Sequence, residues 1–286
     1  MTADPSTSRQ SSRRLRWVVA GGVLVSAGAF AVIGLPNGRS GSSATASVGS
    51  DLHAVAQNGT RVFVSGHDAA AYSDQPGTWT PISSLSGKDA MSWSFGTSDI
   101  IVGGHEGAFR STDNGATFTP VTGVPVTDVH ATGAAGATAY LASPTGGFYV
   151  SQDAGGTWTR VSATGESFMG SLLVDPTNPL HVMAADMVQG VVQTTDGGRS
   201  WTVLGGMEGP VGLSWNPANH KQIVVTAPAD AGISLDGGTS WIALPVPPGT
   251  GAVSFDSNGR LLAAILTGQS ATISLSSDLG KSWTVE

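Results

Sequence analysis

The sequence predicts an all-β fold, a six-bladed β-propeller of four-stranded blades, preceded by one N-terminal helix. Three observations lead to this prediction. A short motif built around an aspartate recurs six times, the segments between its copies have the composition of short strands and turns, and no helical periodicity of useful length follows residue 36. Repeats of about 40 residues that each hold four strands are typical of propeller blades.

The repeated motif consists of a small polar residue, any residue, Asp, any residue, Gly, any residue, Ser or Thr, and an aromatic residue. Five copies match it closely, such as residues 151–158 (SQDAGGTW), whereas a sixth copy carries Pro76 in place of the glycine. Successive motif aspartates are separated by 39, 40, 43, 40 and 42 residues, and they are Asp74, Asp113, Asp153, Asp196, Asp236 and Asp278. This regular spacing indicates an internal repeat.

Each repeat is expected to form four strands. In the fourth repeat these are residues 171–174, 181–185, 190–194 and 200–204, with a turn rich in proline between the first two. The aspartate motif then connects the third strand to the fourth. The predicted second strands of the other repeats are residues 61–65, 100–103, 138–142, 222–226 and 261–265.

The motif has a physical explanation that needs no catalysis. Glycine adopts the positive φ of a tight turn without steric cost. The aspartate accepts hydrogen bonds from backbone N–H groups of its own turn, and the aromatic residue packs the start of the fourth strand against the neighbouring blade. We therefore expect a structural role for the six aspartates.

The motif resembles the Asp-box, or bacterial neuraminidase repeat, over roughly residues 50–286. That family includes sialidases, sortilin-type receptors and photosystem II assembly factors, so the resemblance implies a propeller and leaves the function open. It also implies that the motif turns lie on the face opposite the ligand pocket. We call the face of the motif turns the box face. The ligand face carries the links between blades and the turns between second and third strands.

The amino-terminal segment differs in charge from the rest of the chain. Residues 1–39 carry five arginines and one acidic residue, a net charge of +4, whereas the remainder carries eight basic and 19 acidic residues, a net charge of −11. A domain this acidic repels nucleic acids, so we expect no nucleic-acid partner. The chain contains no cysteine, which excludes disulfides and restricts any metal site to histidine and carboxylate ligands.

An uncharged run over residues 17–35 predicts a transmembrane anchor or signal segment spanning residues 17–36. As a helix, this run would span roughly 28 Å, close to the hydrocarbon thickness of a bilayer. The arginines of residues 1–16 predict that this segment is cytoplasmic and that the propeller is extracytoplasmic, in the bacterial envelope. The length of the run favours an uncleaved single-pass anchor in the cell membrane, and secretion after signal cleavage is the alternative.

The remaining chain divides into a flexible linker over residues 37–49 and the propeller over residues 50–286. Each repeat ends with its fourth strand, so residues 282–286 complete the last blade. Two ways of closing the ring are open. The first and last blades exchange no strand, or residues 44–49 add one.

The arginines argue against sialidase activity. As the family resemblance implies, a sialidase needs three arginines for the substrate carboxylate and an activated tyrosine. Strand order places every arginine that follows residue 39 on the box face or beside a motif, namely Arg61, Arg110, Arg160, Arg199 and Arg260. A true sialidase is therefore not expected.

Four of the six histidines map to the ligand face of three adjacent blades. Two open first strands and two close second strands, so strand order brings them to one face. With their neighbouring carboxylates, the ligand-face candidates are His53, His67, Asp68, His105, Glu106, Asp128 and His130. Three histidines with a carboxylate are able to hold Zn²⁺ or a similar divalent ion, and the predicted metal ligands are His67, His105 and His130. The alternatives are a polar or sugar ligand, acid–base groups, or strand ends that face solvent.

Two classes of function remain open at this stage. The first is a membrane-anchored or exported scaffold for binding or assembly, which presents its channel face to a protein or glycan and requires no cofactor. The second is a hydrolase of glycans or other envelope substrates, glycosyl hydrolase-like or metal-dependent, that uses ligand-face carboxylates and histidines. The missing arginine triad and the anchor favour the first class, and no catalytic residue is assigned.

Overall fold

The computed structural model describes residues 45–228 and 230–286. The predicted cytoplasmic segment 1–16, the predicted anchor or signal segment 17–36 and residues 37–44 of the predicted linker lie outside this part of the chain. Within it, the one helical segment is the 3-10 helix η1 (Ser83–Leu85), and no helix is long and apolar enough to cross a membrane.

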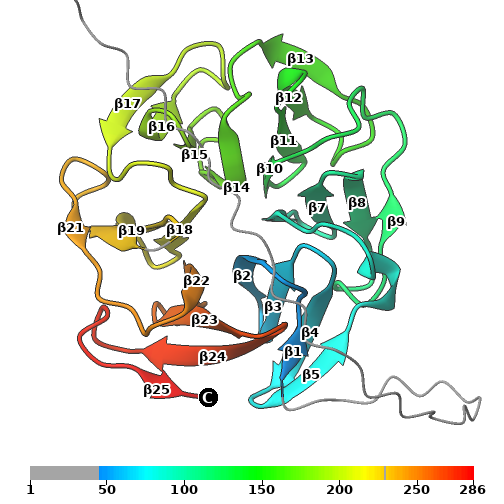
Figure 1. Cartoon of the computed structure of the whole chain (residues 1–286). Helices are drawn as coiled ribbons and strands as arrows, with labels where there is room; N and C mark the ends of the chain where they lie inside the picture. Colours follow the sequence, from blue (N-terminus) through cyan, green and yellow to red (C-terminus); the bar gives the residue numbers. More distant parts are fainter. Residues whose placement is uncertain (1–44, 229) are drawn as a thin grey trace, which may run out of the picture. The chain divides into compact units, whose positions relative to one another are not determined.

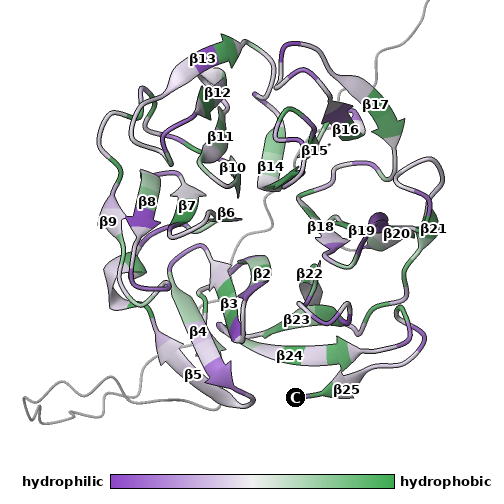
Figure 2. Cartoon of the chain, turned by 180° about the vertical axis from the view of Figure 1, so that it is seen from behind, coloured by the Kyte–Doolittle hydropathy of each residue, from purple (hydrophilic) through white to green (hydrophobic). Residues whose placement is uncertain are grey.

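Apart from β1 (Ala46–Ser47), the strands fall into consecutive groups of four, which are arranged around a ring (Figure 1). We call each group a blade. Within a blade, strand order follows the chain and neighbouring strands are antiparallel, with the first strand nearest the centre of the ring. Figure 2 shows hydrophobic residues along many strands and hydrophilic residues at many of the turns.

The first three blades occupy residues 52–162. Blade one comprises β2 (Leu52–Asn58), β3 (Arg61–Gly66), β4 (Ala70–Gln75) and β5 (Thr78–Pro81). Blade two comprises β6 (Ser92–Phe95), β7 (Ile100–Gly104), β8 (Gly107–Ser111) and β9 (Thr119–Pro120). Blade three comprises β10 (Ala131–Ala135), β11 (Thr138–Ser143), β12 (Gly147–Ser151) and β13 (Thr159–Ser162).

The last three blades occupy residues 168–285. Blade four comprises β14 (Phe168–Val174), β15 (Val182–Asp186), β16 (Gly190–Thr194) and β17 (Thr202–Gly205). Blade five comprises β18 (Gly212–Asn216), β19 (Asn219–Thr226), β20 (Ala231–Ser234) and β21 (Ile242–Ala243). Blade six comprises β22 (Thr250–Phe255), β23 (Leu261–Thr267), β24 (Ser270–Ser276) and β25 (Thr284–Val285). Parallel pairing between β10 and β14 joins blades three and four into one eight-stranded sheet.

In five blades, a hydrogen-bonded turn connects the third strand to the fourth. In blade three, the hydroxyl of Ser151 donates to Asp153 at 2.7 Å and accepts from the backbone N–H of Gly155 at 2.8 Å. The Asp153 carboxylate also accepts from the backbone N–H and the hydroxyl of Thr157, at 2.8 and 2.7 Å. These hydrogen bonds lower the pKa of Asp153 to about 2. The same pattern surrounds Asp113, Asp196, Asp236 and Asp278.

Blade one departs from this pattern. Pro76 has no backbone N–H, and Gln75 pairs directly with Thr78 in a tight hairpin. The carboxylate of Asp74 instead accepts two hydrogen bonds of 2.7 Å from Arg61 on the neighbouring strand. The structure thus corrects the contact expected for Asp74, whose carboxylate joins β4 to β3 through an ion pair instead of accepting hydrogen bonds from its own turn.

The motif glycines contact the preceding blade. Gly198 has a φ of 92°, and a Cβ atom added there would lie 2.4 Å from the ring of Phe148 in blade three. A Cβ atom on Gly280 would likewise lie 2.4 Å from Leu244 in blade five. These positions therefore require glycine for close packing as well as for the backbone angle.

Six hydrophobic clusters of described residues fill the spaces between neighbouring blades. Each cluster combines residues of two adjacent blades with one motif aromatic, and these aromatics are Trp79, Phe118, Trp158, Trp201, Trp241 and Trp283. Phe118 packs edge-to-face on Trp93 at a ring separation of 5.8 Å. The blades are thus held together mainly by apolar packing between their faces.

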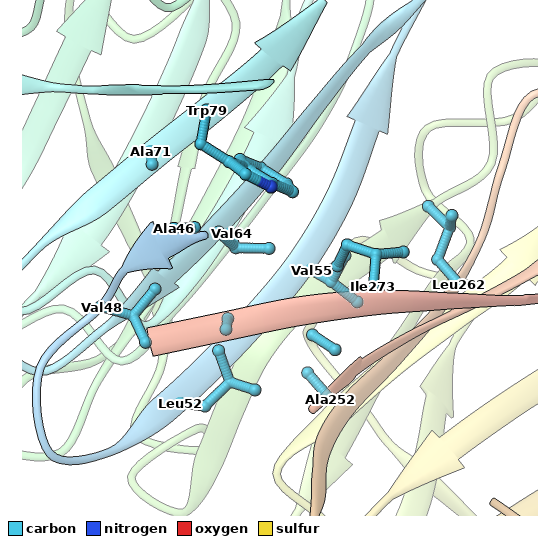
Figure 3. Close-up of a cluster of buried hydrophobic side chains, with 12 residues drawn as sticks. Ala46, Val48, Leu52, Val55, Val64, Ala71, Trp79, Ala252, Leu262 and Ile273 are labelled. Carbon is cyan, nitrogen blue, oxygen red and sulfur yellow. The ribbon is translucent and has the colours of Figure 1, made fainter. Parts of the chain in front are cut away.

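The two ends of the described chain meet in blade six. β1 (Ala46–Ser47) pairs with the start of β24, and β25 pairs further along the same strand. Ala46 and Val48 are fully buried in the cluster that contains Trp79 of blade one and Ile273 of blade six (Figure 3). Of the two ways of closing the ring, the structure has the second, in which part of the predicted linker adds a strand.

The turn hydrogen bonds predict the effect of removing the Ser151 hydroxyl. Ser151→Ala leaves the buried N–H of Gly155 without its acceptor, so we expect the free energy of unfolding to fall by about 1–3 kcal/mol. Ser162→Ala is the matched control, because the buried hydroxyl of Ser162 has no hydrogen-bond partner among the described residues. Denaturant unfolding followed by circular dichroism measures both variants, and equal losses would contradict the assigned role of Ser151.

The motif aspartates also predict acid sensitivity. Their pKa is about 2 at Asp113, Asp153, Asp236 and Asp278, against about 3.9 in an unfolded chain. Because these pKa values are lower in the folded state, the stability they contribute is complete above pH ~4 and is lost as the pH falls toward 2. The thermal midpoint should therefore fall across this window.

The matched control for acid sensitivity is the double variant Asp153→Asn/Asp236→Asn. Asparagine does not titrate, so the fall in thermal midpoint between pH 4 and pH 2 should be smaller in this variant than in the wild type. A wild-type midpoint that stays constant from pH 5 to pH 2 would rule out this account of the motif.

Candidate metal centre

The four predicted ligand-face histidines form a row across blades one to three. His53 belongs to β2 and His130 directly precedes β10, while His67 and His105 follow β3 and β7. The ring centroids are 6.3 Å apart for His53 and His67, 6.4 Å for His67 and His105, and 5.0 Å for His105 and His130. Strand ends of three blades therefore bring four imidazoles within reach of one another.

A buried carboxylate, that of Asp89, contacts three of these histidines. Asp89 lies in the link between blades one and two and is 2% exposed. Its Oδ1 lies 2.9 Å from Nε2 of His53. Its Oδ2 lies 3.5 Å from Nδ1 of His67 and 3.3 Å from Nε2 of His105. We call His53, His67 and Asp89 the Asp89 group, because their ligand atoms converge on one region.

A second set of ligand atoms lies on the other side of His105. Oδ1 of Asp128 is 3.1 Å from Nδ1 of His105 and 3.0 Å from Nε2 of His130, and the two nitrogens are 3.3 Å apart. We call these three residues the Asp128 group. The side chains of His105 and Asp128 are 48% and 29% exposed, so this group lies nearer to solvent than Asp89.

The carboxylate of Asp89 lacks hydrogen bonds. Both of its oxygens are buried, and neither has a hydrogen-bond partner among the described residues. Nε2 of His53 is also buried without a partner in this part of the chain, although it lies 2.9 Å from the carboxylate, because the two groups do not have hydrogen-bond geometry. A buried carboxylate is costly unless a cation compensates it, and here that cation is either a protonated His53 or a bound metal ion.

The two groups differ in their electrostatics. Burial lowers the pKa of His53, but the neighbouring Asp89 outweighs burial, so the pKa of His53 is raised. The pKa of His130 is lowered, because burial and the charge of His105 together outweigh the attraction of Asp128. His130 therefore remains a neutral imidazole, the form that binds metals, down to a lower pH than an ordinary histidine.

The donor atoms of both groups are of the kind that suits a transition-metal ion. Imidazole nitrogens with a carboxylate oxygen suit Zn²⁺, Cu²⁺ or Ni²⁺, whereas Mg²⁺ and Ca²⁺ prefer oxygen ligands alone. A tetrahedral ion with bonds of about 2.0–2.1 Å holds its ligand atoms about 3.3 Å apart. The contacts of 2.9–3.5 Å at Asp89 and of 3.0–3.3 Å in the Asp128 group lie around this value.

The structure divides the predicted metal ligands differently from the sequence analysis. His67 falls in the Asp89 group, while His105 and His130 fall in the Asp128 group. The division arises because the ring of His105 lies between two carboxylates rather than beside one.

Two other predicted candidates lie outside both groups. The carboxylate of Glu106 accepts a 3.0 Å hydrogen bond from the backbone N–H of Asp89, so Glu106 fixes the link that carries this residue. Asp68 is exposed, and its carboxylate lies beside the backbone of Gly49. Glu106 thus positions a ligand atom, whereas Asp68 contributes none.

Asp89, the most buried member of the two groups, is not among the residues predicted from the sequence. A short repeat reveals it in retrospect. The tripeptides Asp51-Leu52-His53, Asp89-Ala90-Met91 and Asp128-Val129-His130 stand at the entry to the first strands of blades one, two and three. Methionine replaces histidine in the middle copy, which conceals the pattern in a search for histidines alone.

A depression adjoins the Asp89 group. It has a volume of about 210 Å³, and its lining includes His53, Met91 and Met169. These residues stand at or near the starts of first strands, so the depression lies at the channel end that carries the histidines. It provides space for a small group beside His53.

The five arginines of the described chain are engaged elsewhere. Arg61, Arg110 and Arg260 pair with carboxylates, and the remaining two donate to backbone carbonyls. Their partners are Asp74, Asp99, Asp256, Gly146 and Asp196. None of these contacts involves the histidine row.

Comparisons with known proteins bear on the fold. No family model matches the sequence, and no curated protein matches it. Among solved structures, the chain is similar to the GH74 xyloglucanase from Xanthomonas campestris, with 15% identity, a TM-score of 0.59 and coverage of 85% of this chain and 46% of that chain. The chain is a β-propeller.

Two further structures resemble this propeller. One is the GH74 enzyme from Niastella koreensis, with 18% identity, a TM-score of 0.52 and coverage of 82% of this chain and 46% of that chain. The other is YCF48 from Cyanidioschyzon merolae, with 17% identity, a TM-score of 0.53 and coverage of 85% and 86%. This propeller spans less than half the length of either GH74 enzyme. At these identities the likeness shows the fold alone, so the function must be argued from the site.

Proposed function

We propose that this chain is an extracytoplasmic metal-binding scaffold. It holds a divalent transition-metal ion at the Asp89 group and presents the ion on the ligand face to a protein or glycan partner. The observation that carries this proposal is the buried carboxylate of Asp89. It has no hydrogen-bond partner among the described residues, while nitrogens of three histidines lie within 3.5 Å. A bound cation compensates this charge.

The surface exposure of the histidines supports a role in binding. The side chains of His67 and His105 are 53% and 48% exposed, so an ion held beside them is accessible from outside. A partner that offers a carboxylate, an imidazole or a sugar hydroxyl would complete the coordination of this ion. In this function the metal ion links the ligand face of the propeller to its partner, and no covalent bond of the partner is cleaved.

Features of the whole chain support the architecture and the location that this function requires. The consecutive blades and their aspartate turns are those of a six-bladed Asp-box propeller, which is the architecture we propose. The apolar run of residues 17–36 and the arginines before it support a single-pass membrane anchor, or a cleaved signal, that places the propeller outside the cytoplasm.

The proposal predicts Zn²⁺ binding that depends on Asp89. Full-length protein in detergent, stripped of metal with a chelator, should bind Zn²⁺ in isothermal titration calorimetry. Asp89→Asn removes the anionic ligand and should weaken the tightest binding by roughly tenfold or more. His220→Gln is the matched control, because His220 stacks on Trp215 at 4.2 Å in blade five, outside both ligand groups.

The outcome of this comparison is decisive for the proposal. Wild type and His220→Gln should bind alike, with unchanged circular dichroism spectra in all three proteins. Failure of the folded wild type to bind Zn²⁺ more tightly than Asp89→Asn would show that the histidine row is not a metal centre.

A metal-dependent hydrolase is the second candidate function. Catalytic zinc sites keep one coordination position open for water or substrate, and the exposed sides of His67 and His105 leave such a position. Zn²⁺-loaded full-length protein would then release product from a panel of polysaccharides, xyloglucan included, or of simple esters. Asp89→Asn should abolish that turnover. Normal Zn²⁺ binding without turnover on any substrate of the panel favours the scaffold.

A further inference from the structure

The ring of His105 belongs to both ligand groups. Its Nε2 lies 3.3 Å from Oδ2 of Asp89. Its Nδ1 lies 3.1 Å from Oδ1 of Asp128 and 3.3 Å from Nε2 of His130. Each nitrogen of this one imidazole therefore faces a separate set of metal-ligating atoms.

Three metal-ligating atoms lie close together on the Asp128 side. Nδ1 of His105 and Nε2 of His130 both lie within 3.1 Å of the same oxygen of Asp128 and 3.3 Å from each other. If both nitrogens carry protons, both N–H groups donate to the same carboxylate oxygen. If one does not, its lone pair faces the carboxylate. A single cation inside the triangle attracts all three lone pairs at once.

We propose that the propeller binds two divalent transition-metal ions bridged by the imidazole of His105. The first ion binds the Asp89 group and Nε2 of His105. The second binds Nδ1 of His105 with Asp128 and His130. When the second ion binds, the neutral ring of His105 gives its remaining N–H proton to solvent and becomes an imidazolate. This inference rests on the proposed function, since the first ion is the one assigned there.

The two positions differ in donor number and burial. The first offers three histidine nitrogens and the carboxylate of Asp89, which is 2% exposed. The second offers two histidine nitrogens and the carboxylate of Asp128, which is 29% exposed. The first ion is therefore expected to bind more tightly, and the second keeps more contact with solvent. Metal–nitrogen bonds of about 2 Å on opposite sides of the ring place the ions about 6 Å apart.

Metal stoichiometry tests the bridge. Full-length protein in detergent is stripped of metal, equilibrated with excess Zn²⁺, freed of unbound ions and analysed for zinc per chain. Wild type and the control His220→Gln should hold two ions. His130→Ala and Asp128→Asn should each hold one, because both variants retain the Asp89 group. Circular dichroism checks that each variant is folded.

Cu²⁺ gives a readout that stoichiometry alone does not. Two Cu²⁺ ions joined by one imidazolate couple magnetically, so electron paramagnetic resonance of the wild type should show less signal per ion at two equivalents than at one. His130→Ala, limited to one ion, should show the full signal of an isolated Cu²⁺.

The possible results separate this inference from the proposed function. One zinc per wild-type chain, lost in Asp89→Asn, would overturn the bridge and leave the proposed function intact. No bound zinc would overturn both. Two zinc ions that persist in His130→Ala and Asp128→Asn, or two Cu²⁺ ions without coupling in the wild type, would place the second ion elsewhere and overturn the bridge.

Discussion

The structure depends on one repeated contact, in which each motif turn packs against the preceding blade. A serine or threonine hydroxyl accepts a hydrogen bond from the buried glycine N–H, as Ser151 does from Gly155, and the glycine backbone then approaches the preceding blade closely. A Cβ atom there would lie 2.4–3.0 Å from a neighbouring side chain in all five close copies of the motif. Repeated around the ring, this contact sets the spacing of the blades on the box face.

The opposite face is consequently available for chemistry. The histidines and carboxylates of the two ligand groups come from the start of β2, from links between blades and from the turns after β3 and β7. The aspartate motif does not constrain these positions. The same turn position in blade four has a purely structural role. There Asp186 is buried and accepts hydrogen bonds from Ser167, Val188 and Gln189, so its carboxylate is fully used. The turn after a second strand thus either is closed by its own carboxylate, as in blade four, or carries a histidine of the two ligand groups, as in blades one and two.

Strand order could be predicted from the sequence because a regular repeat and short strands constrain it strongly. The same order predicted that four histidines share a face. Each strand has one end on each face of the ring, so the order of the strands assigns every strand end to one of the two faces. Side-chain contacts between different blades could not be predicted from the order of the strands. Asp89 lies in an irregular link, and the position of the His105 ring between two carboxylates depends on side-chain rotamers. Asp74 also escaped prediction, because its partner Arg61 lies on another strand.

The pairing of β1 with β24 has a consequence for how the chain folds. Ala46 is among the first described residues to be synthesised, and its partner Ala271 is among the last. Until blade six exists, Ala46, Val48 and the face of blade one around Trp79 have no covering surface. Such long-range contacts form late and expose apolar surface to aggregation meanwhile. A chaperone that shields this edge during synthesis would therefore act on the first blade, not the last.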